Sequence, residues 1–108
     1  YFQGVAIADI KDIACMKIDA ISTRGTKRDF IDLFFICKKY NLSTLFSLFA
    51  KKYSEVNYNF FHNIKSLGYF PTADQEEMPK MVKKVDWEKV KRFFTEEQKK
   101  LTKKLLEI

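Results

Sequence analysis

The fold is decided by residues 9–40, which read DIKDIACMKIDAISTRGTKRDFIDLFFICKKY. Apolar side chains recur at intervals of three and four in this stretch, the spacing of a helix with one buried face. Asp9 and Thr26 are residue types that cap helix N-termini, and Gly25 is a type that ends a helix. We therefore predict one helix from Asp9 to about Gly25 and a second from Thr26 to about Tyr40.

The rest of the chain continues the helical pattern with one interruption. Ser43 and Asn57 are the predicted caps of a third and a fourth helix, and Gly68 is the predicted stop of the fourth. The pattern fails over residues 69–85, which predicts a long loop, and Asp86 is the predicted cap of a last helix. The sequence thus predicts an all-α helical bundle of about five helices, with a long loop before the last helix and the first two helices packed antiparallel.

Composition is that of one globular domain. The chain has 108 residues, of which 46% are hydrophobic and 31% charged, a balance that argues against disorder. Residues 1–4 (YFQG) resemble the end of a protease-cleavable tag, so we assign the helical domain to residues 5–108. No apolar run approaches the ~20 residues that span a membrane, and we expect a cytoplasmic protein.

The first predicted helix carries a charge within its apolar face. This face is formed by Ile10, Ala14 and Ile21. On a helical wheel Lys17 falls in its centre, with Arg24 close beside it. Because lysine is seldom buried without a partner, two interpretations are open. The ammonium extends outward from the rim of the bundle, or it points into a cleft that binds an anion such as a triphosphate.

The second predicted helix carries the opposite charges. It is apolar nearly all round, which predicts burial, yet Asp29 and Asp32 share one of its faces. Buried carboxylates need cationic or metal partners. The short turn allows Lys17 and Arg24 to meet them near one end of the helix pair. A functional site and a closed structural ion network would both give this pattern.

The same residues carry a family resemblance. Residues 12–21 (DIACMKIDAI) and 24–33 (RGTKRDFIDL) resemble the C-terminal signature of the AbiEii-type nucleotidyltransferases. That signature is a helix with K-x-x-A and a following arginine, then R-D-x-x-D-L on the next helix. Weaker support comes from residues 66–70 (SLGYF), 78–79 (MP) and 85–87 (VDW).

The resemblance implies an activity. Members of the family are similar to polymerase-β-type transferases, serve as toxins in toxin–antitoxin and phage-defence systems, and in some cases transfer nucleotides from NTP to tRNA. The family's lysine corresponds to Lys17 and its late aspartate to Asp29 or Asp32, so these three are the candidate catalytic residues. Arg24 is the candidate substrate-binding residue: it clamps a phosphate, or it fixes the helix junction by pairing with an aspartate.

One part of the family pattern is missing. The N-terminal α/β domain of such transferases carries a Gly-Ser motif and a D-x-D metal site, and neither motif occurs in this chain. The resemblance therefore implies the C-terminal part of a longer protein, inactive alone, with Mg²⁺ bound mainly outside it and a cognate antitoxin as a candidate partner. The alternatives are a helical module that binds RNA or a partner protein without catalysis, and an interaction domain whose buried charges are only structural.

Overall fold

The structure is a computed structural model that describes residues 7–53, 59–80 and 85–106. The described residues form six helices and no strand, so the all-α prediction is confirmed. In chain order the helices are α1 (Ile7–Thr23), α2 (Lys27–Ile36), α3 (Leu42–Lys52), α4 (Phe60–Ser66), α5 (Pro71–Asp74) and α6 (Trp87–Leu106). None of them is long and apolar enough to cross a bilayer.

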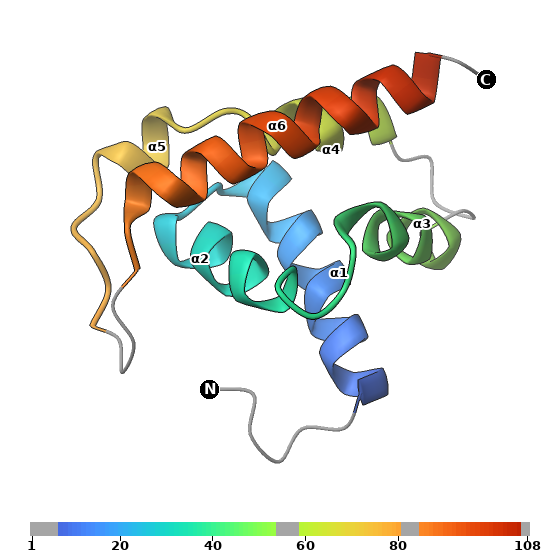
Figure 1. The fold of residues 1–108 in the computed structure, drawn as a ribbon, viewed down its shortest axis with the longest axis horizontal. Coiled ribbons are helices and arrows are strands. Elements are labelled where there is room, and N and C mark those ends of the chain that lie inside the picture. The colour runs from blue at the N-terminus through green and yellow to red at the C-terminus, as the bar shows by residue number, and fades with distance from the viewer. Residues whose placement is uncertain (1–6, 54–58, 81–84, 107–108) are drawn as a thin grey trace.

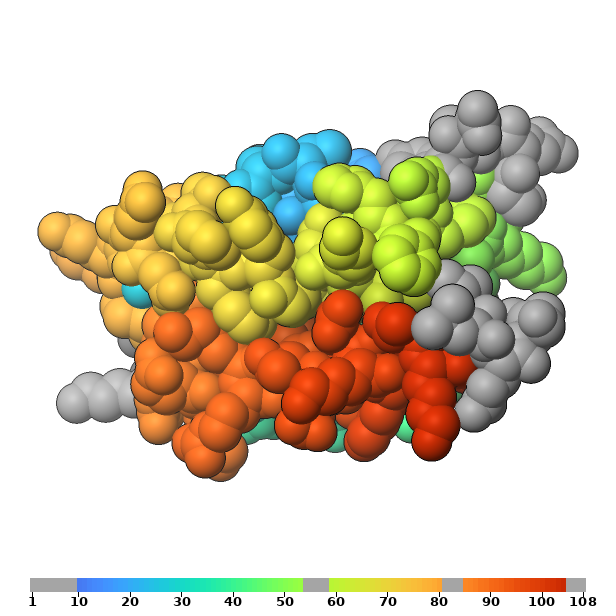
Figure 2. Space-filling view, turned by 90° about the horizontal axis from the view of Figure 1, so that it is seen from above, coloured from blue at the N-terminus to red at the C-terminus, as the bar shows by residue number. Residues whose placement is uncertain are grey.

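Helix α1 lies at the centre of the bundle. It contacts α2, α3 and α4, while α6 packs across α2 and α4 (Figure 1). Seen from above, α6 runs as an orange-to-red rod beside the yellow-green α4 (Figure 2). The core between α2 and α6 is aromatic: Phe30 and Phe94 are fully buried with ring centroids 5.5 Å apart. Burial of these rings fixes α6 against the helix pair that carries the site.

The turn between α1 and α2 follows the sequence prediction. Gly25 has φ of 59°, and a Cβ there would lie 3.3 Å from the Ile21 carbonyl oxygen, so only glycine fits without strain. Thr26 is the N-cap of α2, as predicted, and its hydroxyl accepts a hydrogen bond from the Asp29 amide at 3.2 Å. After this turn α2 runs back beside α1 (Figure 1).

Several predicted helix ends are wrong by two to four residues. Helix α1 begins at Ile7, ahead of the predicted cap Asp9. Helix α2 ends at Ile36 rather than Tyr40, because the Lys38 and Lys39 amides bond three residues back and close turns that lead into α3.

The caps of the two following helices also differ from the prediction. Asn41, not Ser43, caps α3, and its side chain accepts from the Ser43 amide at 2.8 Å. The predicted cap of α4, Asn57, lies outside the described residues. Asn59 caps that helix by accepting from the His62 amide at 3.1 Å.

The segment predicted as a loop contains a short helix. Helix α5 is one turn long and starts with Pro71, whose fixed φ suits the first helical position. It is the sixth helix, beyond the five predicted. The predicted cap of the last helix is confirmed, because Asp86 Oδ1 accepts a hydrogen bond from the Glu88 amide at 3.0 Å.

Candidate functional site

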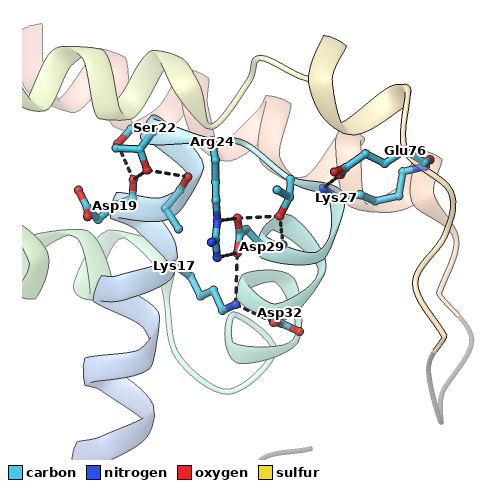
Figure 3. Close-up of polar contacts among 11 residues, drawn as sticks. Lys17, Asp19, Ser22, Arg24, Lys27, Asp29, Asp32 and Glu76 are labelled. Atoms are coloured by element: carbon cyan, nitrogen blue, oxygen red, sulfur yellow. Dashed lines mark hydrogen bonds and ion pairs between the residues drawn. The ribbon is translucent and has the colours of Figure 1, made fainter.

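The candidate catalytic side chains meet between α1 and α2. Lys17 Nζ lies 3.3 Å from Asp29 Oδ1 and 2.9 Å from Asp32 Oδ2 (Figure 3). The side chains of Asp29 and Asp32 are 1% and 9% exposed, and that of Lys17 is 17% exposed. The position predicted for Lys17, within a few ångströms of an aspartate, is therefore confirmed. The ammonium pairs with two carboxylates and still reaches the surface.

Asp29 is bonded on both oxygens. Arg24 Nε donates to Asp29 Oδ2 at 2.8 Å and Arg24 Nη2 donates to Oδ1 at 3.0 Å, a bidentate pair. The Thr26 hydroxyl donates to Oδ2 at 2.7 Å, and Lys17 donates to Oδ1. These bonds fill the roughly four lone-pair sites of a carboxylate. Asp29 thus ties the end of α1, the turn and the start of α2 together.

Electrostatics keep the pair ionised. Burial opposes the charge of Asp29, but hydrogen bonds from Arg24 and Thr26 and the charge of Lys17 outweigh it, so the pKa of Asp29 lies below its usual value. Burial also opposes the charge of Lys17. The close ion pair with Asp32, together with the charge and hydrogen bond of Asp29, outweighs that effect and raises the pKa of Lys17. At neutral pH Lys17 is a cation and Asp29 an anion.

Asp32 has a different environment from Asp29. Its buried Oδ2 lies 2.9 Å from the Lys17 ammonium but makes no conventional hydrogen bond within the part of the chain described. Neither Arg24 nor Thr26 bonds to Asp32; both bond to Asp29. Among the described residues, Asp32 is therefore the carboxylate of the cluster that retains unoccupied hydrogen-bond acceptor sites.

A second polar contact holds the first turn of α2, and the sequence analysis did not predict it. The Lys27 amide donates to Glu76 Oε1 at 2.5 Å, and Lys27 Nζ donates to the Glu76 carbonyl at 2.6 Å (Figure 3). The Lys27 ammonium also lies 5.1 Å from the centroid of the Trp87 ring. The segment after α5 is thereby attached to the helix that carries both aspartates.

One protein-family model matches nearly the whole chain. A family model described as nucleotidyl transferase AbiEii toxin, type IV TA system, matches residues 2–106. The chain belongs to the AbiEii toxin family. The matched range starts inside residues 1–4, which the sequence analysis assigned to a tag.

One curated relative of this AbiEii-family chain is an uncharacterized protein of Aquifex aeolicus (strain VF5). It is 43% identical over 93 residues, which are 84% of this chain and 43% of the relative. The chain thus spans less than half the length of that relative. No solved structure matches the chain significantly.

The cluster of this AbiEii-family chain does not have the ligands of a magnesium site. No group of three His, Cys, Asp or Glu side chains that could hold a metal ion occurs among the described residues. Both oxygens of Asp29 already accept hydrogen bonds, and the Asp32 carboxylate lies against an ammonium. Magnesium binding requires open oxygen ligands in octahedral geometry, so these residues alone do not fit the ion.

Proposed function

We propose that this chain is the C-terminal part of a toxin-type nucleotidyltransferase that transfers nucleotides from NTP, with tRNA as an acceptor. Family membership supports the reaction class. The observation that supports a role for this part is the Lys17 ammonium, which two buried aspartates hold at the surface between α1 and α2. In this proposal the cluster forms one wall of a cleft, and Mg²⁺ is bound mainly by carboxylates outside residues 1–108.

Lys17 is the proposed phosphate-binding group. An ammonium has three N–H donors: one donates to Asp29 Oδ1, and a second lies toward Asp32 in an ion pair. The third donor is available to a phosphate oxygen, and the raised pKa keeps the charge present at neutral pH. A fixed cation of this kind stabilises the charge that develops during nucleotidyl transfer.

The two aspartates have separate roles in this proposal. Asp29 positions Lys17 and Arg24, because its oxygens are already filled by donors. Asp32 is the proposed catalytic carboxylate, because its Oδ2 meets only the ammonium among the described residues. Such a carboxylate is able to accept the proton of an attacking hydroxyl group.

Substitutions in a protein of the relative's full length test this assignment. Transfer of labelled nucleotide to tRNA should fall ~10²–10³-fold in Lys17→Ala, the usual loss for one electrostatic contact in a transition state. Asp32→Asn should lower kcat comparably without loss of folding. Asp12→Asn is the matched control, because the Asp12 side chain is 65% exposed on α1. Wild-type rates from a folded Lys17→Ala protein would remove the cluster from the mechanism.

A second candidate function is binding without catalysis. It is favoured by the charges of the cluster, since Lys17, Arg24, Asp29 and Asp32 sum to zero and already satisfy one another. In that case the bundle binds RNA or a partner protein, and both substitutions leave transfer unchanged. Membership of a toxin–antitoxin family supports a cognate antitoxin as one partner. We propose the cytoplasm as the location of both proteins.

A further inference from the structure

A hollow of about 330 Å³ adjoins the ion cluster through Arg24. Its walls are the C-terminal end of α1 with the following turn, one face of α4, and the segment that leads into α5. Figure 2 shows this end of α1, in blue, at the surface beside the yellow-green and yellow segments. Lys17, Asp29 and Asp32 do not line the hollow, so it is a separate site that shares only Arg24 with the cluster.

The lining of the hollow is basic. Lys65 contributes a positive charge, His62 an imidazole and Arg24 a guanidinium whose charge is paired with Asp29, whereas no aspartate or glutamate lines the hollow. Lys65 is exposed, and no ion pair of its ammonium occurs in the described part of the chain. A cation without a counter-charge beside a hollow attracts anions. The lining therefore favours a phosphate-bearing ligand.

Arg24 is oriented before any ligand arrives. Its Nε and Nη2 are held by the two oxygens of Asp29, yet its side chain is 63% exposed. Nη1 makes no hydrogen bond to the residues that the structure describes, so it is able to donate to a ligand. A guanidinium held in place by one carboxylate loses little freedom when it binds a phosphate oxygen.

Tyr69 provides an aromatic surface at the same hollow. It lines the site and is 65% exposed. Exposed aromatic rings beside cationic groups are the usual platform for stacking a nucleic-acid base. The volume lies at the lower end of the ~300–1,000 Å³ typical of ligand sites, which suits a single nucleotide unit.

We propose that this hollow binds one nucleotide of a single-stranded RNA, with the phosphate on Arg24 and Lys65 and the base on Tyr69. The proposal rests on the proposed function, because a strand held here lies next to the Lys17 cluster where its end would react. A free nucleoside triphosphate carries the same two groups, and the experiment separates these two sources.

The test is fluorescence polarisation of a short labelled single-stranded RNA with the 108-residue chain. Tyr69→Ala should weaken binding about five- to a hundredfold, the usual effect of losing one stacked base. Lys65→Gln should reduce the slope of log affinity against log salt by about 0.7. Lys89→Gln is the matched control, an exposed lysine on α6 away from the hollow, and should change neither quantity.

The outcomes are distinct. Equal affinity of the parent chain and a folded Tyr69→Ala variant overturns the proposal, as does a loss in Lys89→Gln as large as that in Lys65→Gln. Competition with ATP and with inorganic phosphate identifies the source. If ATP displaces the RNA at a concentration no higher than that of the RNA, the hollow is assigned to free nucleotide and the proposal of a bound RNA strand is rejected. Binding is measured without transfer, so this result and the transfer assay fail independently.

Discussion

At the scale of single residues, Asp29 organises the site. Its carboxylate accepts hydrogen bonds from Lys17, from both arms of the Arg24 guanidinium and from the Thr26 hydroxyl. Thr26 also caps α2 through the amide of the same aspartate. One residue therefore joins helix capping to ion pairing, and its removal affects both.

Asp29→Asn should destabilise the chain by about 3 kcal/mol, the lower end of the cost of breaking a buried ion pair, because Arg24 remains exposed to solvent. The measurement is urea denaturation followed by circular dichroism. Asp12→Asn is the control, since its contact with Lys52 at 3.5 Å is an exposed pair that contributes about 0–1 kcal/mol. A loss no larger than that of Asp12→Asn would mean that the cluster adds little to stability.

The lowered pKa of Asp29 gives a pH dependence of defined sign. A carboxyl group whose pKa is lower in the folded state stabilises the fold above its unfolded pKa of about 4, and this contribution is lost as the pH falls toward the folded value. The acid limb of stability against pH should therefore be shallower in Asp29→Asn. Part of the limb should remain, because the Trp87 indole and Lys91 also lower the pKa of Asp74. Identical acid limbs would contradict the ionisation proposed for Asp29.

The sequence was sufficient to predict which side chains form the cluster, but not which aspartate accepts the hydrogen bonds of Arg24 and Thr26. A lysine within an apolar arc and two aspartates on a buried helix have to meet, since buried charges require counter-charges. Which aspartate is filled by donors depends on the turn at Gly25, which directs Arg24 and Thr26 to Asp29 and not to Asp32. That outcome is set by side-chain geometry, which helical periodicity does not contain.

At the scale of elements, side chains of the segment around α5 bond to both α2 and α6, and we call this set of contacts the clamp. Glu76 bonds to both the amide and the ammonium of Lys27, which stands 49 positions away in the chain. Asp74 accepts from the Trp87 indole at 2.8 Å and from Lys91 at 3.0 Å. The partner of Glu76 could not be predicted from the sequence, because nothing local links the two segments.

Glu76→Ala should destabilise the chain by about 1 kcal/mol, since it removes a carboxylate bonded to an amide at a helix N-terminus. Hydrogen exchange should increase most in the first turn of α2. Glu77→Ala is a matched control: it is the adjacent exposed acidic residue, with no described contact. Equal exchange in the two variants would show that the clamp does not restrain α2.

At the scale of the whole molecule, the packing of the helices holds the Lys17 cation in an ordered position. Helix α1 is surrounded by α2, α3 and α4, and α6 closes over α2 and α4, so the backbone that carries Lys17 and the aspartates is held by core packing. Fixed scaffolding of this kind preorganises charges and lowers the reorganisation needed for reaction. The arrangement suits half of a shared cleft, in which the carboxylates for metal ions come from elsewhere.

The last prediction follows from this distribution of charge. The 108-residue chain should neither bind Mg²⁺–NTP tightly nor transfer nucleotides, whereas a protein of the relative's full length should do both. A magnesium–triphosphate complex needs open carboxylates for the ion as well as cations for the phosphates. The described residues provide Lys17 and Arg24, but one aspartate is filled and no third acidic side chain joins the cluster. Isothermal titration with Mg²⁺–NTP and transfer of labelled nucleotide to tRNA measure the two properties on both proteins. A labelled product made by the 108-residue chain alone would show that the active site, with its metal-binding groups, is complete within this chain.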